Sequence, residues 1–130
     1  MSSIFSKIIS GEIPSYKIAE NEDFLAFLDI NPLAKGHTLV IPKKESDYIF
    51  EMENDEYSKF WLFAKNIAKA LRKTQACKRI GVAVIGLEVA HTHIHLVPIN
   101  AVYDIDFSKP KLKLSPEELS KIAKDIKAAL

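Results

Sequence analysis

Four histidines are the residues of this chain best suited to carry out chemistry, and three of them lie close together. His91, His93 and His95 alternate with two other residues in the sequence. On a β-strand, side chains alternate between two faces, so these imidazoles would project from one face at intervals of about 6.6 Å. The fourth, His37, begins another apolar run. If the two strands are neighbours, all four histidines share one surface.

Such a row of imidazoles is suited to nucleophilic catalysis at phosphorus. A neutral imidazole nitrogen is a good nucleophile near pH 7, and flanking imidazoles that carry a proton can bind phosphate oxygens. Two alternatives remain open. The histidines could be hydrogen-bonded polar residues of a half-exposed strand. Alternatively, two of them and His37 could bind zinc, with Glu88 orienting a ligand.

The pattern of apolar and turn residues predicts an α+β fold. The order of elements predicts a largely antiparallel five-stranded sheet with one long helix, a short N-terminal helix and a C-terminal helix. In the last strand, Ile94 and Leu96 would enter the core on the face opposite the histidines. We expect a helix over 4–9 ended by Gly11, strands over 16–19, 24–28 and 37–41, a long helix over 55–73 after an Asn54 cap, strands over 80–85 and 89–99, and a final helix that begins at Pro116 after a Ser115 cap.

Composition narrows the possible classes of function. The chain has 130 residues, with 18 Lys and Arg against 17 Asp and Glu, for a net charge of +1. This predicts a single domain over residues 1–130 without a nucleic-acid or membrane partner. No apolar run approaches the roughly 20 residues of a membrane span, and no secretory signal is expected at the N-terminus. The one cysteine, Cys77, favours a reducing compartment, so we expect a cytoplasmic protein.

The histidine segment resembles the His-x-His-x-His motif of the histidine-triad (HIT) family, and is most similar to its Hint-like, nucleotide-binding branch. The resemblance covers roughly residues 3–99. It implies a HIT-like α+β fold that forms a homodimer. It also implies hydrolysis or transfer at the α-phosphorus of nucleoside phosphoramidates or dinucleoside polyphosphates. Upstream of the histidines, the segments that follow the family order are 4–9, 11–14, 27–32 and 36–44.

The resemblance implies roles for individual residues. His93 corresponds to the nucleophile that forms a nucleotidyl-histidine intermediate, and His95 to the neighbour that contacts phosphate. His91 corresponds to the residue that supports the nucleophile, and His37 to a further histidine close to the site. Asp29 corresponds to the carboxylate that binds ribose hydroxyls, although a turn role is its alternative. The apolar lining of the base pocket, for which core packing is the alternative, corresponds to Ile4, Phe5, Ile8, Phe27 and Ile30.

The sequence departs from the family at a structural zinc site. Many bacterial members bind zinc through a Cys-x-x-Cys pair and two histidines. Here the cysteine positions are Ser3 and Ser6, one histidine position is Glu45, and only His91 remains. One imidazole with two hydroxyls is a poor zinc site, so we expect no structural metal.

Glu88 is a second departure. It stands in a shortened loop, where the family has a hydroxyl that binds phosphate or assists the leaving group. An ionised carboxylate there would repel phosphate, whereas it could also act as a general acid or bind a leaving amine. We therefore place Glu88 among the nucleotide-binding residues.

The leading hypothesis is a cytoplasmic, homodimeric nucleotide hydrolase or transferase that uses His93 as its nucleophile. Because the imidazoles supply the positive charge, we expect no metal and no other cofactor. The alternative is a nucleotide-binding interaction or sensor protein with vestigial activity. A third hypothesis is a zinc enzyme built on the histidine row.

Overall fold

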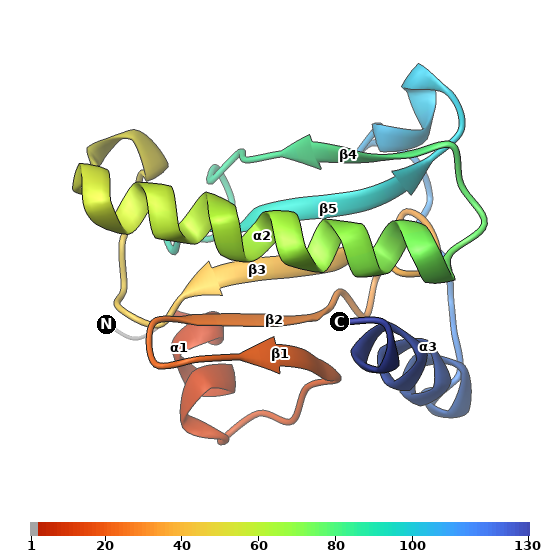
Figure 1. The fold of residues 1–130 in the computed structure, drawn as a ribbon, viewed down its shortest axis with the longest axis horizontal. Helices are drawn as coiled ribbons and strands as arrows, with labels where there is room; N and C mark the ends of the chain where they lie inside the picture. The colour runs from red at the N-terminus through yellow and green to blue at the C-terminus, as the bar shows by residue number, and fades with distance from the viewer. Residues whose placement is uncertain (1–2) are drawn as a thin grey trace.

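The computed structural model describes residues 3–130, which form a five-stranded sheet with α-helices on both of its faces (Figure 1). Two short 3₁₀ turns, η1 and η2, connect the elements. In chain order, the elements are α1 (Ile4–Ser10), β1 (Lys17–Glu20), β2 (Phe24–Leu28), β3 (Thr38–Pro42), η1 (Ile49–Glu51), α2 (Asn54–Thr74), β4 (Arg79–Ala83), β5 (Ile94–Ile99), η2 (Val102–Ile105) and α3 (Pro116–Ala128).

The sheet confirms the predicted α+β class. Its strand order is β1-β2-β3-β5-β4, and every neighbouring pair is antiparallel. β5, which carries the end of the histidine segment, therefore lies between β3 and β4. The strand that begins directly after His37 is its neighbour, which was the condition for His37 to share a surface with the other histidines.

Alternation along the strands divides the core between the two faces of the sheet. On one face, Ala26, Val40 and Ile94 pack with apolar residues of α2 and α3. On the other face, Phe27 and Leu39 pack with residues of α1. Figure 1 shows the long α2 lying across the first face. A cleft lined by His37, His93 and His95 lies on this second face, beside α1.

The predicted helices are confirmed, and the ends of α1 and α3 follow the expected chemistry. The cap prediction was wrong for α2, in which Asn54 is the first helical residue and Glu53 precedes it without a side-chain cap. Ser3 caps α1 by accepting a hydrogen bond from the Ser6 N–H, and Gly11 ends that helix at a φ of 86°. Ser115 and Glu118 form the capping box of α3. Within residues 3–130, no helix combines the length and apolar content that crossing a membrane requires.

The strand prediction over 89–99 was wrong in its first half. β5 begins only at Ile94, and residues 84–93 form an irregular loop after β4. Polar groups of this loop bond to backbone groups outside the strand ladder. The Thr92 N–H donates to the Ser46 carbonyl, and the His91 ring donates to the Pro42 carbonyl. His91 and Thr92 thus bond to the segment that follows β3 and lie outside the ladder of β5.

Candidate active site

A cleft of about 390 Å³ lies on the α1 side of the sheet. It is bounded by α1, the C-terminal end of β2, the loop before β5 and a segment after η2. This size suits a small-molecule ligand. Its lining residues are Ile4, Phe5, Ile8, Ile13, Pro14, Ser15, Phe27, Leu28, Asp29, Ile30, Asn31, His37, Leu39, Glu88, Val89, His93, His95, Phe107 and Lys111.

Strand register sets the floor of the cleft. Leu39 on β3 pairs with Phe27 on β2 and with His95 on β5. Paired residues of neighbouring antiparallel strands point to the same face. His95 is therefore placed on an apolar floor by the same alternation that sends Ile94 and Leu96 into the opposite core, as predicted.

His93 holds one ring nitrogen ready for attack. Its Nδ1 lies 2.8 Å from the carbonyl oxygen of His91, so Nδ1 carries the proton and donates it. In a neutral ring, Nε2 then keeps its lone pair. Burial lowers the pKa of His93, although the bond to the His91 carbonyl partly opposes that effect. The neutral, nucleophilic form is thus favoured at pH 7.

His91 lies behind the cleft and does not line it. Its ring is fully buried and contacts Phe5 edge-on at 5.7 Å between centroids. Nε2 donates to the Pro42 carbonyl oxygen at 2.8 Å, and Nδ1 lies 2.8 Å from Oγ of Ser3. Fixed on both sides, His91 presents its backbone carbonyl to His93. The His91 ring thus lies on the α1 side of the sheet, as the His93 ring does, because both contact Phe5, but it does not line the cleft.

A chain of hydrogen bonds fixes the tautomers of the other two histidines. The Leu33 N–H donates to Nδ1 of His37 at 3.0 Å, so the proton of neutral His37 is on Nε2. That nitrogen lies 3.0 Å from Nδ1 of His95 and donates to it. His95 therefore carries its proton on Nε2. The rings of His93 and His95 are 4.8 Å apart between centroids, so a nucleophilic nitrogen and an N–H donor belong to adjacent rings.

The flanking imidazoles are neutral in the free protein, which corrects the expectation that they supply positive charge. Burial lowers the pKa of His37 to about 4 and that of His95 to about 3. The positive charge of Lys111 acts in the same direction on His37. Sequence spacing could not reveal this effect, because it depends on how deeply the folded chain buries each ring.

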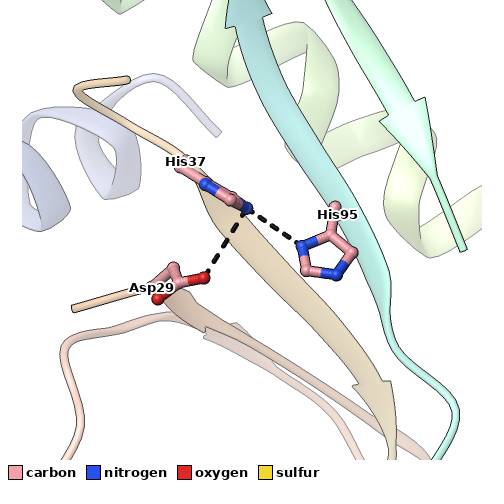
Figure 2. A group of neighbouring side chains, drawn as sticks. All are labelled: Asp29, His37 and His95. Carbon is pink, nitrogen blue, oxygen red and sulfur yellow. Dashed lines mark hydrogen bonds and ion pairs between the residues drawn. The ribbon is translucent and has the colours of Figure 1, made fainter. Parts of the chain in front are cut away.

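Asp29, His37 and His95 form a cluster with the spacing of a metal site, but their hydrogen bonds do not suit a metal. Figure 2 shows Nε2 of His37 between Nδ1 of His95 and a carboxylate oxygen of Asp29. Metal ligation needs a lone pair on the coordinating nitrogen. The Leu33 N–H occupies the lone pair of Nδ1 in His37, so Nε2 is protonated. His37 and His95 are better described as a hydrogen-bonded relay than as part of a zinc centre, and the Asp29 carboxylate lies 3.7 Å from Nε2 of His37.

Comparison with known proteins matches most of the chain to one domain type. The family model of the HIT domain matches residues 10–102. This chain belongs to the HIT family. It is 34% identical to the adenosine 5'-monophosphoramidase hnt1 of Schizosaccharomyces pombe, over 100% of this chain and 99% of that protein. It is 37% identical to an uncharacterized HIT-like protein of Borreliella burgdorferi, over 95% of this chain and 94% of the relative.

Solved structures of HIT proteins share the fold. A HIT-like protein of Bartonella henselae, described as involved in cell-cycle regulation, superposes with a TM-score of 0.86 and 34% identity over 99% of this chain and 96% of its own. A zinc-bound histidine-triad protein of Mycobacterium smegmatis gives a TM-score of 0.80 and 29% identity, over 99% of this chain and 93% of its own.

Within this HIT fold, all of the predicted site residues except His91 line the cleft. Phe5, Ile8 and Phe27 are buried in its apolar wall, whereas Ile4 and Ile30 are more than half exposed at its mouth. The wall also belongs to the core cluster around α1. Core packing and cleft lining are therefore not exclusive roles for the buried members of this set.

Asp29 and Glu88 bring two carboxylates to the HIT cleft. Oδ1 of Asp29 accepts a hydrogen bond from the Asn31 N–H at 2.9 Å, as in a turn, while the residue still lines the cleft. Burial raises the pKa of Asp29, although the bond from Asn31 opposes that effect. Glu88 is exposed, and its negative charge raises the pKa of His93. Both carboxylates thus act electrostatically on the nucleophile.

The four positions that form the family's zinc site come together here without usual zinc donors. Oγ of Ser3 lies 2.8 Å from Nδ1 of His91 and 3.3 Å from Oγ of Ser6. The Ser6 hydroxyl in turn donates to Glu45 at 3.3 Å. Two hydroxyls, one carboxylate and one imidazole do not suit tetrahedral zinc. A hydrogen-bonded chain holds His91 instead.

Phe107 and Lys111 are among the cleft residues that were not predicted from the sequence. Phe107 and Lys111 lie between η2 and α3, in a basic, proline-containing segment without apolar periodicity. The Phe107 ring contacts His95 edge-on at 4.7 Å and His37 at 6.1 Å between centroids. The sequence signal was limited to an aromatic residue among lysines, and contacts at this sequence distance leave no local pattern.

Proposed function

We propose that this HIT protein is a nucleotide hydrolase or transferase that acts at the α-phosphorus of nucleoside phosphoramidates or dinucleoside polyphosphates. The proposed intermediate is a nucleotidyl group bonded to His93. The single observation that carries this proposal is the bond from Nδ1 of His93 to the His91 carbonyl, which leaves the Nε2 lone pair available in the cleft. The likeness to the monophosphoramidase of S. pombe supports the same class of substrate.

In the first step, Nε2 of His93 attacks the α-phosphorus. The Nε2–P bond forms as the P–N or P–O bond to the leaving group breaks, and the leaving group takes that electron pair and a proton from solvent. The His93 ring becomes positively charged when Nε2 bonds to phosphorus. The His91 carbonyl stabilises that charge, because it accepts a hydrogen bond from Nδ1–H of His93. The Nε2–H of His95 donates to a phosphate oxygen, and a neutral donor suffices because it is oriented in advance.

In the second step, water attacks the same phosphorus. A P–O bond forms as the Nε2–P bond breaks, the electron pair returns to His93 and the water proton is released. The product is a nucleoside monophosphate. His37 keeps His95 in the donor tautomer through both steps, since its Nε2–H occupies Nδ1 of His95.

Asp29 and the apolar wall position the nucleoside. The carboxylate of Asp29 accepts hydrogen bonds from the ribose hydroxyls, and the base packs against the wall that includes Phe5 and Phe27. The edge contact of Phe5 with His93, at 4.9 Å between centroids, places this wall directly beside the nucleophile.

Glu88 favours an amine leaving group over an anionic one. Its negative charge acts on His93, so it lies within electrostatic reach of the bond that breaks. A carboxylate there would attract a cationic amine and repel a polyphosphate. We expect Glu88→Gln to lower kcat/KM for an adenosine phosphoramidate of lysine and to leave or raise it for a dinucleoside polyphosphate. An equal change for both substrates would remove this role.

The experiment that tests the proposed function is turnover of adenosine 5'-phosphoramidate by the wild-type protein and by His93→Ala. We expect turnover by the wild type, loss of turnover in the variant and retained binding of AMP. The control is Lys109→Met, which changes a half-buried residue outside the cleft. Full activity of His93→Ala would contradict the proposal. Tight AMP binding by the wild type without turnover of any conjugate would favour the nucleotide-sensing alternative.

We also propose a homodimer. β4 is an edge strand with an unpaired outer side, and Val82 on it is about half exposed. On α2, Leu62 is also exposed. Apolar side chains along a free edge commonly mark an interface. Light scattering should give twice the mass of one chain, and Val82→Glu should shift that mass toward the monomer.

We further propose that residues 1–130 act as one HIT-like domain in the cytoplasm. Residues 103–130 follow the region matched by the HIT model, and they contribute α3 to the core and Phe107 to the cleft. The proposed location rests on the cysteine content, because a sequence with Cys77 as its one cysteine favours a reducing compartment. Truncation after residue 102 should therefore unfold the chain, and cell fractionation tests the location.

A further inference from the structure

The charges around the cleft leave a bound phosphate with few positive partners. Asp29 and Glu88 are carboxylates, and His37 and His95 are neutral at pH 7. Among the cleft-lining residues of the described chain, Lys111 is the one lysine or arginine. An anion that enters this site must be stabilised by neutral donors and by that single cation.

Lys111 is held in place by the backbone of its own segment. Its Nζ donates to the carbonyl oxygens of Phe107 at 2.6 Å and of Lys109 at 3.0 Å. An ammonium group has three donors, so one remains for a ligand. The next residue, Leu112, donates its N–H to the Pro32 carbonyl at 2.9 Å, which ties the segment to the loop that follows Asp29.

Phe107 places this cation beside the relay. Its carbonyl binds Lys111, while its ring lies against His95 and His37. Burial is the larger influence on both neighbours, and the charge of Lys111 adds to it by lowering the pKa of His37 and opposes it at Asp29, where burial raises the pKa. Lys111 is thus electrostatically coupled to the side of the cleft where His95 offers its N–H.

We propose that Lys111 is a phosphate-binding residue, which donates to an oxygen of the nucleotide phosphate on the His37 and His95 side of the cleft. This inference rests on the proposed function, since it takes the ligand to be a nucleotide. Phe107 is a positioning residue that holds the Lys111 ammonium over the relay. A segment outside the matched HIT region then completes the anion site.

The test compares ligands with and without a phosphate. Calorimetry on the full chain gives Kd for AMP and for adenosine in the wild type, Lys111→Met and Lys111→Gln. The glutamine amide can still donate to the Phe107 carbonyl, so it keeps the turn closed without the charge. The matched control is Lys109→Met, because Lys109 lies in the same turn over the Tyr103 ring and does not line the cleft.

Both Lys111 variants should bind AMP roughly tenfold more weakly, the expected loss for one hydrogen bond to a charged group at a partly exposed site. Adenosine should bind within about twofold of the wild type. Lys111→Arg should restore AMP binding, and Lys109→Met should bind both ligands normally. Equal weakening of AMP and adenosine would show a structural role only, and unchanged AMP binding would show that Lys111 does not contact the phosphate. Either result overturns the inference.

The same proteins separate this inference from the proposed function. Turnover of adenosine 5'-phosphoramidate by the wild type tests the enzyme, whereas the ratio of the AMP and adenosine Kd values tests Lys111. If the wild type shows no turnover but its AMP binding depends on Lys111, the proposed function is refuted and the phosphate site is supported. If the wild type is active but the Lys111 variants bind AMP normally, the proposed function is supported and the phosphate site is refuted.

Discussion

His37 donates through Nε2 to Nδ1 of His95 over 3.0 Å, and this bond gives His95 a role opposite to that of the adjacent His93. It makes Nε2 of His95 a donor, whereas the His91 carbonyl makes Nε2 of His93 an acceptor. Burial keeps both rings neutral at pH 7. The site can thus offer a nucleophile and a phosphate donor without any imidazole being charged in advance.

Loss of the His37 ring should impair chemistry more than binding. In His37→Ala, His95 can exchange its tautomer, so we expect kcat to fall roughly tenfold or more, as for loss of one hydrogen bond to developing charge. KM for adenosine 5'-phosphoramidate should change little. Steady-state kinetics measure both, and melting temperature reports the cost of leaving the Leu33 N–H without its partner. An unchanged kcat would show that His37 does not set the state of His95.

Acid should destabilise the folded protein through the same rings. The pKa of His37 is lowered from 6.5 to about 4 and that of His95 to about 3, so the unfolded chain binds more protons than the folded chain below pH 6.5. The free energy of unfolding should therefore be highest above pH 6.5 and fall toward pH 4, with a limiting slope of about 1.4 kcal/mol per pH unit for each ring. Asp29, whose pKa is raised, opposes this trend in the acid range.

Urea unfolding at several pH values checks that expectation. His95→Gln, which cannot titrate, should show a shallower decline between pH 6.5 and pH 4 than the wild type. A free energy of unfolding that does not change over this range in the wild type would contradict the burial of neutral rings.

Asp29 should distinguish ribose from its deoxy forms. In Asp29→Asn the charged acceptor for the ribose hydroxyls is lost, so AMP should bind roughly 10- to 100-fold more weakly, as for hydrogen bonds to a charged group. Binding of 2',3'-dideoxy-AMP should respond little, because it lacks those hydroxyls. Calorimetry with both nucleotides tests this expectation. An equal loss for both would assign Asp29 to the turn with Asn31 alone.

The polar chain behind His91 should be convertible to a metal site. Ser3, Ser6 and Glu45 already surround His91, with successive contacts of 2.8 to 3.3 Å. We expect the triple variant Ser3→Cys, Ser6→Cys and Glu45→His to bind about one zinc per chain, because it would supply four usual ligands. Elemental analysis measures the metal, with the wild type as control. Near-stoichiometric zinc in the wild type, with activity lost to a chelator, would overturn the metal-free account.

Local patterns predicted much of this molecule. Spacing of apolar residues placed the helices, because amphipathic stripes are local, and the family motif placed His93, His95 and Asp29 at one cleft. The start of β5 was missed because the partners of the His91 ring and of the Thr92 N–H lie in the distant segment that includes Pro42 and Ser46. No pattern within the loop encodes these partners.

Other features depend on tertiary structure alone. The neutral state of His95 results from burial and from its neighbours His93 and His37, which spacing along a strand does not show. Phe107 and Lys111 reach the cleft only because the segment after η2 folds back over it, tied by the bond from Leu112 to Pro32. Such residues carry no periodic signal, although they complete the site.

The most direct test of the central claim is detection of the nucleotide on His93. Wild-type protein is mixed with adenosine 5'-phosphoramidate, stopped within one turnover by neutral denaturant to preserve the N–P bond, and analysed by intact mass and peptide mapping. We expect a transient adduct of one adenylyl group on His93, absent from His93→Ala. Turnover without an adduct, or an adduct on another residue, would contradict nucleophilic attack by His93.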